Sequence, residues 1–488
     1  MEIIHALQLA QANAATQTEP IEGDRIARQT SSSRSQIEQA RPFAHANPQA
    51  RLSNSREIYL VEVCRAFIRY GAPTHRLEEY ARQTSEALGL ELRSFDMPGC
   101  MMISIRDTPQ EPPRVHIVRC DEGLVLSKLY DAHAVHKKVI HKQLTVEEAI
   151  LRLEDVANQK DTFPRWMRVF AYGLASMSIG PVSYGARPID LLIIFLLGSL
   201  LGFMELVLAP ASELYAHVLE ISAAILISFL ARAFGSIPAG PDIKPCFSAI
   251  CQASLVMILP GLTITRSALE LQSRNTVSGS VRMIYGVIIV LFLAFGITIG
   301  ATIYGAMDGA ATSATTCTNT WPFWWQVVFV APFTFFYIVI NQGSWSKMPT
   351  MIVISLSGWF VNYFAGQRFA SNPQVTQALG ALAIGILANL CSRLGHGLAI
   401  ALLLPAVYLQ VPGSFAATGS LISGLARADE LVHNGMGGTT NAQANTAILN
   451  AGYAMVEIAI GITVGLSVSA LVVYPIRKTK GKSGLFSF

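Results

Sequence analysis

The chain has 488 residues, of which 51% are hydrophobic and 14% are charged, well below the roughly 25% charged residues of an average soluble domain. Residues 1–168 hold 22 basic and 22 acidic residues, whereas residues 169–475 hold ten of each. This split excludes an enzyme of two similar soluble domains. The net charge of +4, without a basic stripe, also excludes a nucleic-acid-binding protein. Composition therefore favours a soluble N-terminal part followed by a polytopic membrane domain.

The N-terminal part divides into two segments. Residues 1–55 are rich in polar residues and lack apolar periodicity, which predicts a disordered segment. Residues 56–160 predict a cytosolic α+β domain. A helical stripe ends at Gly71, a second helix runs from Thr74, which we expect to be its N-cap, to the stop at Gly89, and Thr145 opens a capping box. Three alternating segments lie between these helices, at 90–95, 101–106 and 114–119, and predict strands.

Several motifs of enzymes and metal proteins are missing from the sequence. His133 and His136 share a helix face with zinc-compatible spacing, but no third ligand follows, so we expect a solvated basic face and no metal. The seven cysteines form no C-x-x-C pair, which indicates free thiols. No nucleophile elbow and no P-loop occur. We therefore expect neither an enzyme, nor a bound cofactor, nor ATP-driven transport.

Ten segments of roughly 17–25 residues each are apolar enough to span a membrane. Basic residues in the connecting loops favour a cytosolic location for both termini, which requires an even number of spans. The choice between plasma and vacuolar membrane stays open. The spans form modules of five over 165–305 and 321–475, followed by a basic cytosolic tail over 476–488. They lie near 166–184, 188–208, 214–234, 246–265, 282–304, 322–341, 348–366, 375–393, 396–411 and 452–475.

The two membrane modules contain a short repeated pattern. Leu259-Pro260 and Leu404-Pro405 each begin the pattern L-P-x17-S-G-x2-R, at an offset of 145 residues. Chance is one explanation, because Leu, Ser and Gly are common. The other is an internal duplication of five spans, in which the second copy is inverted because five is odd. Inverted repeats with helices broken at Pro and Gly are a recurrent design of secondary transporters.

At this point the N-terminal motif becomes informative. Phe67-Ile-Arg-Tyr-Gly71-Ala-Pro73-Thr74-His-Arg76-Leu-Glu78, followed by Leu88-Gly89-Leu90, resembles the opening signature of the threonine/serine exporter family. The stretch from Trp345 through 425–430 is most similar to the fungal, pheromone-regulated membrane protein 10-like members. The resemblance implies ten spans, a cytosolic N-terminal domain, and export of threonine or serine driven by the proton-motive force. The sequence departs from the family pattern where Pro405-Ala406 replaces an expected Pro-Gly.

Candidate site residues follow from the chemistry of an amino acid in a membrane. Its carboxylate needs an anion site, which a helix N-terminus after a Pro-Gly break provides, and its ammonium group needs an acceptor. Buried carboxylates in spans are functional candidates, and Glu205 and Glu220 are the ones we expect to accept the ammonium group or couple protons. The candidate substrate-binding residues are Pro260, Gly261, Thr263, Thr265, Pro405, Pro412 and Gly413.

Two functions are consistent with these features. The first is a secondary transporter that exports small neutral amino acids, coupled to protons. The second is a multi-span scaffold or sensor whose cytosolic domain binds a partner. An anchor needs one span rather than ten with a repeat, so the transporter is favoured. The expected partners are a small amino acid, protons and the lipid bilayer, and a homo-oligomer is left open.

Overall fold

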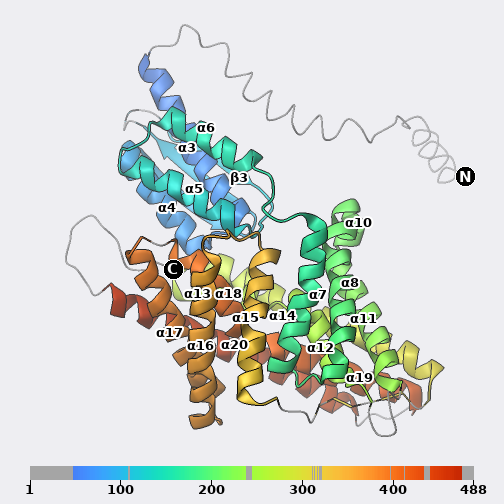
Figure 1. Cartoon of the computed structure of the whole chain (residues 1–488). Helices are drawn as coiled ribbons and strands as arrows, with labels where there is room; N and C mark the ends of the chain where they lie inside the picture. Colours follow the sequence, from blue (N-terminus) through green and yellow to red (C-terminus); the bar gives the residue numbers. More distant parts are fainter. Residues whose placement is uncertain are drawn as a thin grey trace, which may run out of the picture. The chain divides into compact units, whose positions relative to one another are not determined.

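The computed structural model describes residues 48–107, 110, 112–237, 244–309, 311–312, 314–315, 317, 321–395, 397–410, 413–433 and 440–474. From Glu57 onward these residues belong to one compact unit, with an α+β region (57–158) and a set of long helices (165–473) (Figure 1). Helix α3 (Pro48–Tyr70) begins before Arg56, so 48–55 are helical rather than disordered. The rest of the predicted disordered segment and the predicted tail lie outside the described residues.

The α+β region has the elements that the sequence predicts. Helix α4 (Thr74–Leu88) ends at Gly89, which has left-handed backbone angles, and the Thr145 hydroxyl caps α6 (Val146–Asn158) by accepting the N–H of Glu148. Gly71 has φ of +91°, and a Cβ there would lie 2.5 Å from the carbonyl oxygen of Gly123, so only glycine fits. Strands β1 (Glu91–Met97), β2 (Cys100–Arg106) and β3 (Arg114–Arg119) form an antiparallel sheet in the order β1-β2-β3, followed by α5 (Leu126–Ile140).

The histidine face of α5 packs on aromatic side chains rather than facing solvent, with His136 buried and His133 half-buried. The ring of His136 lies 5.1 Å from that of Tyr80 and 5.5 Å from that of Phe67, and His136 is only 2% exposed. Burial lowers the pKa of His133 to about 3 and that of His136 to about 4, so both stay neutral. The predicted solvated basic face is therefore wrong, because α4 packs its aromatic side chain over it. Among the described residues no cluster of three metal-ligating side chains occurs.

The long helices follow in two series. The first comprises α7 (Arg165–Ser183), α8 (Pro188–Phe203) with the π-turn η1 (Met204–Leu208) and α9 (Ala209–Ala211), α10 (Glu213–Ala216), α11 (Leu219–Ser236), α12 (Phe247–Leu255) with the 3₁₀ turn η2 (Val256–Ile258), α13 (Gly261–Gln272) and α14 (Thr276–Met307). The second comprises α15 (Phe323–Ile340), α16 (Met348–Arg368), α17 (Pro373–Arg393), α18 (Ala399–Gln410), α19 (Gly413–His433) and α20 (Thr440–Val473). Each of the ten predicted spans overlaps one of these helices.

Fewer helices meet the length and composition of a span than the sequence predicts. Within the described residues seven helices are long and apolar enough, or eight when the pair α12–η2 and α13, bent by 49°, is counted as one. The two predicted spans outside this count correspond to α7 and to α18, which has only 12 residues. The structure thus supports a polytopic helical protein, while the number of ten spans stays a prediction.

Helix pairings recur in the two series. In the first, α7 packs on α8, α8 on α12, α11 on α14, and α13 on α14; in the second, α15 packs on α16, α16 on α18, α17 on α20, and α19 on α20. The series meet where α7 packs on α15, α14 on α19, and α13 on α20. Glycines permit the closest approaches: a Cβ at Gly296 of α14 would lie 2.5 Å from Cβ of Ala224, and one at Gly461 of α20 would lie 2.6 Å from the carbonyl oxygen of Gln374.

One pair of cysteines is bonded, contrary to the prediction of free thiols. Cys246, at the N-terminus of α12, forms a disulfide with Cys317, with Cα atoms 6.1 Å apart. The remaining five cysteines are free. The bonded cysteines are separated by 71 residues in the sequence. They meet only because α14 runs back across the helices and brings Cys317 to the end of α12, so the spacing of cysteines in the sequence does not reveal the pair. Asp190 supports the same corner, because its carboxylate accepts the backbone N–H groups of Arg187 (2.7 Å) and Cys246 (2.8 Å).

Candidate functional site

A cavity of about 180 Å³ lies at the break between η2 and α13. It is lined from the first series by α7, η2 and α13, and from the second by α15, α16, α17 and α18. None of the described side chains that line it is Asp, Glu, Lys or Arg. The lining residues are Ile179, Val182, Ser183, Tyr184, Val256, Leu259, Gly261, Phe333, Trp359, Asn362, Gln377, Tyr408, Leu409 and Gln410. We call this space the central cavity.

The last turn of α18 supplies the strongest polar groups of the central cavity. Gln410 is 2% exposed, and its amide nitrogen donates to the carbonyl oxygen of Gly358 at 3.0 Å. Its amide oxygen has no hydrogen-bond partner among the described residues. The Tyr408 hydroxyl donates to the carbonyl oxygen of Val256 at 2.8 Å, one of the carbonyl groups that the helix break exposes. A buried oxygen without a donor is costly in an apolar setting, so Gln410 indicates a place for a ligand.

The first half of the predicted site borders this cavity only in part. Pro260 precedes α13 and Gly261 begins it, so the first N–H groups of α13 and its positive dipole end lie at the cavity. Thr265 donates its hydroxyl hydrogen to the carbonyl oxygen of Gly261 at 3.0 Å and is buried within α13. Thr263 lines a second cavity, described below. The Pro-Gly break is thus at the central cavity, whereas the two threonines are not.

The second half of the predicted site has a different register from the one expected. Helix α18 continues through Pro405, so the break predicted there is wrong. A helix tolerates an interior proline where neighbouring groups compensate for the lost hydrogen bond. Helix α18 ends at Gln410 and α19 begins at Gly413. Pro412 lies outside the described residues, as do the surroundings of Gly413.

The predicted acidic residues lie beside the central cavity rather than in its lining. Glu205 is half-buried in the π-turn η1, close to Tyr172 and Arg168. Tyr172 also lies close to Tyr408, which lines the cavity. Single π-turns within α-helices occur often at functional sites. Glu220 is half-buried in the first turn of α11 and near Glu205. A role of either carboxylate in proton coupling stays a prediction.

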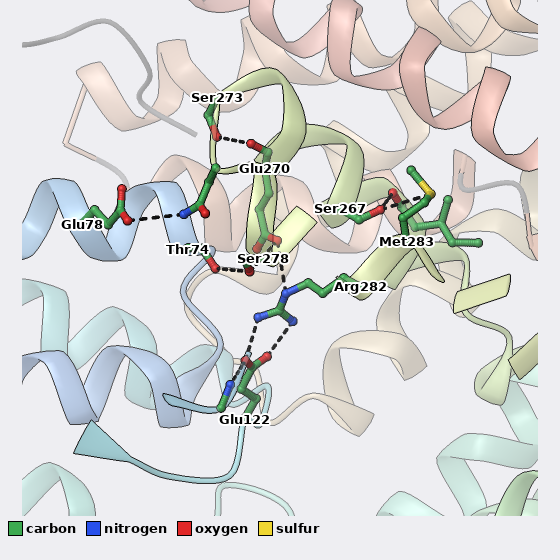
Figure 2. A network of polar contacts seen from close by, with 12 residues as sticks. Thr74, Glu78, Glu122, Ser267, Glu270, Ser273, Ser278, Arg282 and Met283 are labelled. Carbon is green, nitrogen blue, oxygen red and sulfur yellow. Dashed lines mark hydrogen bonds and ion pairs between the residues drawn. The ribbon is translucent and has the colours of Figure 1, made fainter. Parts of the chain in front are cut away.

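A second group of polar residues joins α13 and α14 to the α+β region (Figure 2). The Arg282 guanidinium donates to both oxygens of Glu122, at 2.6 and 2.7 Å, and Glu122 also accepts the N–H of Gly99 at 2.7 Å. The Nε atom of Arg282 lies 3.2 Å from Glu270, which accepts the Ser278 hydroxyl at 3.0 Å. Glu270 is 1% exposed. These contacts link the β1–β2 turn and the segment after β3 to α14 and to the C-terminal end of α13.

Residues of the N-terminal motif take part in the same contacts. Thr74 is the first residue of α4 and does not cap it; its hydroxyl lies 3.4 Å from that of Ser278. The prediction of Thr74 as N-cap is therefore wrong, since Pro73 occupies the N-cap position. Glu78 accepts the side-chain amide of Asn275 at 3.4 Å. Arg76 instead lies within the region, 5.8 Å from the ring of Tyr80.

The electrostatics of this group are dominated by carboxylates. Burial raises the pKa of Asp96, on β1, to about 7, while Thr74 and Arg282 act in the opposite direction. Burial and Glu270 raise the pKa of Glu78. Burial opposes ionisation of Glu122 as well, but its hydrogen bonds to Arg282 hold its pKa below the usual value. We call this group, completed by Glu270 and Arg266, the junction cluster.

Sequence reasoning singled out Thr74, Glu78 and Gly261 but missed the rest of the junction cluster and of the cavity lining. One signal for Glu270 was present, because it is among only ten acidic residues between 169 and 475 and follows the Pro260-Gly261 break on the same helix. Asp96 and Glu122 do not stand out in the same way, because they lie among the many charged residues of the N-terminal region. Gln410 is one of several glutamines in the apolar segments, and nothing in the sequence distinguishes it from the others. Beside the cluster lies a second cavity, of about 920 Å³, lined by residues that include Thr263, Gly99, Glu122, Arg282 and Tyr285.

Comparison with known proteins identifies the family. The profile of a family described as "Putative threonine/serine exporter" matches residues 58–304 and 315–432. The chain is similar to proteins named pheromone-regulated membrane protein 10 from Candida glabrata (43% identity over 436 residues, 88% of this chain and 54% of the relative), Eremothecium gossypii (40% over 432 residues, 88% and 58%) and Saccharomyces cerevisiae (41% over 432 residues, 88% and 56%). No solved structure matches it significantly.

The chain spans about half the length of the curated relatives it matches. The matched residues include the N-terminal motif, most of both series of helices with the exception of α20, and the lining of the central cavity. Together with the apolar helices, this makes the chain an integral multi-pass membrane protein with fungal relatives. It belongs to the threonine/serine exporter family.

Proposed function

We propose that the chain is a secondary transporter of small neutral amino acids of the threonine and serine type, which exports them and is coupled to protons. The observation that carries this proposal is the central cavity at the break before α13, lined by both series of helices and by no charged side chain among the described residues. A cavity without fixed charge favours a solute of zero net charge, such as an amino-acid zwitterion, over ionic solutes.

The size and polarity of the central cavity suit this solute. A cavity of about 150 Å³ is known to hold benzene, with six non-hydrogen atoms, and threonine has eight. The first N–H groups of α13 favour the substrate carboxylate, since they form the positive end of that helix. The unpartnered amide oxygen of Gln410 favours the substrate ammonium group. In this arrangement Gln410 takes the role of acceptor that the sequence suggested for Glu205 or Glu220.

Alternating access requires two halves that move against each other, and the helix pairings support an inverted repeat of five and five. The last helices of the two series carry the related sequences Gly296-Ile-Thr-Ile-Gly300 and Gly461-Ile-Thr-Val-Gly465. Each packs through its first glycine against the third long helix of its own series. The Leu259-Pro260-Gly261 break then corresponds to Val411-Pro412-Gly413, at an offset of 152 residues rather than 145.

The proposed orientation places the α+β region and both termini in the cytosol. The Cys246–Cys317 disulfide belongs to the end of α12 that is farther from the junction cluster. Disulfides persist in oxidising compartments rather than in the cytosol, so this corner suits the opposite side of the membrane. Proton coupling is assigned to Glu205, which lies in the π-turn and reaches the central cavity through Tyr172 and Tyr408.

The proposal is tested by counterflow of radiolabelled threonine and serine into liposomes that contain the purified full chain. We expect saturable uptake that unlabelled serine inhibits and that charged amino acids do not. Gln410→Leu removes one hydrogen bond to the charged ammonium group of the substrate, worth about 1.5–3 kcal/mol, and should raise KM roughly 10- to 150-fold. Gln326→Leu is the matched control, because Gln326 bonds the carbonyl oxygen of Trp321 and does not line the cavity.

A Glu205→Gln variant tests the coupling separately. We expect it to retain counterflow but to lose concentration of substrate against a gradient when a pH difference is imposed. Absence of saturable flux for every neutral amino acid, in liposomes that contain folded protein, would contradict the transporter proposal. The scaffold or sensor, whose cytosolic region binds a partner, would then be the better description.

A further inference from the structure

The junction cluster lies at one end of a helix whose other end borders the central cavity. Gly261 begins α13 at the cavity, and Glu270 lies near its C-terminal end in the cluster. Nine residues of helix separate them, a distance of about 14 Å at 1.5 Å per residue. A displacement of the C-terminal end of α13 is therefore transmitted to the cavity by a rigid element.

The α+β region also contacts α18, a second helix that lines the central cavity. Residues Leu398, Ile400, Ala401 and Leu404, at the start of α18, are buried in the same apolar core as Leu126 and Leu129 of α5. The opposite end of α18 supplies Tyr408 and Gln410 to the cavity lining. The α+β region is thus attached to two of the helices that line the cavity, to α13 by charges and to α18 by apolar packing.

The charges of the junction cluster do not balance. Four carboxylates belong to it, from Glu78, Asp96, Glu122 and Glu270, and two guanidinium groups, from Arg266 and Arg282. With every group ionised the cluster carries two excess negative charges in a largely buried setting. Such an excess is costly, because burial penalises charge and like charges repel. The cluster therefore favours uptake of a proton by one carboxylate.

We propose that the junction cluster is a pH-sensitive latch, in which protonated Asp96 lets Arg282 hold Glu122 and Glu270 together, and ionised Asp96 weakens this grip and releases α13. Its effect on substrate flux rests on the proposed transport function; the latch itself does not. Near pH 7 Asp96 of the latched state is about half protonated.

Groups from four helices and from the segment after β3 face Asp96. They are Cys64 of α3, Thr74 of α4, Glu122 after β3, Glu270 of α13 and Arg282 of α14. Among the charged ones, Glu122 and Glu270 oppose ionisation, and Arg282 favours it but is already bound to both carboxylates. Burial raises the pKa of the Cys64 thiol to about 12, so this group stays neutral. The surroundings of Asp96 thus favour its protonated form.

The direction of the pH dependence follows from linkage. In the latched state burial raises the pKa of Asp96 from its ordinary value of 3.8 to about 7, and release of α13, which removes Glu270 from its surroundings, lowers it. The latched state therefore binds the proton more tightly than the released one. Its population relative to the released state rises as pH falls below 7, by up to about tenfold per pH unit, and is flat above pH 7.

The test compares the wild-type chain with Asp96→Asn in lipid nanodiscs by hydrogen–deuterium exchange of peptides covering 261–282. Asparagine imitates the protonated carboxyl group, so at pH 8 the variant should exchange at least tenfold more slowly than wild type, and at pH 6 the difference should shrink. Asp131→Asn is the matched control, since Asp131 on α5 also has a pKa raised by burial but lies outside the cluster; it should exchange like wild type.

Equal exchange of wild type and Asp96→Asn at pH 8 would overturn the latch. If Asp96→Asn does not fold, the wild-type chain is measured alone at pH 6 and pH 8, and its exchange rates are corrected for the intrinsic pH dependence of exchange. Equal corrected rates for peptides 261–282 at the two pH values would also overturn the latch. Flux measurements separate the two proposals. A pH-dependent latch without any amino-acid flux defeats the transport function only, whereas flux without a change in exchange defeats the latch only.

Discussion

Close packing of α14 against α11 predicts a strong effect of Gly296→Ala. The new methyl group would lie 2.5 Å from Cβ of Ala224 and 2.9 Å from the carbonyl oxygen of Ile221. Ordinary contacts of a Cβ begin near 3.4 Å, so the helices must separate by roughly 1 Å, and the neighbouring backbone cannot rotate away. Overpacking of this kind costs about 1–3 kcal/mol, which exceeds the roughly 1 kcal/mol gained from the higher helix propensity of alanine.

The assay is thermal unfolding of the detergent-solubilised full chain, followed by intrinsic fluorescence at a fixed heating rate. Gly452→Ala on α20 is the control, because no atom lies within 4 Å of the new methyl group, and it should be neutral or slightly stabilising. Gly461→Ala, at the corresponding packing of α20 on α17, should lower the midpoint as Gly296→Ala does, and the double variant should show the sum. If the Gly296→Ala chain unfolds at the same midpoint temperature as the Gly452→Ala control, the packing argument is refuted.

Three further outcomes are expected. Cys246 and Cys317 should react with a thiol reagent in the denatured chain only after reduction, and mass spectrometry of labelled peptides checks this. Asp190→Ala leaves two N–H groups without acceptors and should destabilise the chain by about 2–4 kcal/mol in the same melting assay, whereas Asp155→Ala, at an exposed position of α6, should not. Because the pKa of His136 is lowered to about 4, its contribution to stability is present above pH 6.5 and lost as pH falls toward 4; His136→Phe should reduce this acid sensitivity in melts at pH 5 and 7.5.

The elements of the α+β region were predictable because their signals are local. Gly71 and Gly89 need left-handed backbone angles, Thr145 caps its own helix, and the strands alternate with a period of two. The partners of these elements were not predictable in the same way. Thr74 carries the composition of an N-cap, yet its hydroxyl lies against Ser278, 204 residues later in the chain. Local patterns in a single sequence do not reveal a contact between residues so far apart in the chain.

The proposed repeat illustrates why a constant spacing in the sequence is a poor guide to which helices correspond. A fixed offset of 145 residues matched Pro260 with Pro405, but α18 passes through Pro405 without a break. Helix α19 has 21 residues where α13 has 12, so any duplicated segments drift apart along the chain. Related motifs then lie at offsets of 152 and 165, and no constant spacing detects both. Comparing helices in order, rather than residues at one spacing, removes this difficulty.

The break before α13 gives the proposed transporter and the proposed latch a common physical basis. An unbroken span from Phe247 to Gln272 would hold its two ends rigidly together, so motion at the junction cluster would have to move the whole helix through the bundle. Because the helix stops at Ile258 and begins again at Gly261, its second part can pivot without breaking helical hydrogen bonds. The same interruption exposes the carbonyl oxygen that Tyr408 binds and the N–H groups at the central cavity. Binding of a substrate there, and release of Glu270 at the other end, therefore act on one short rigid helix.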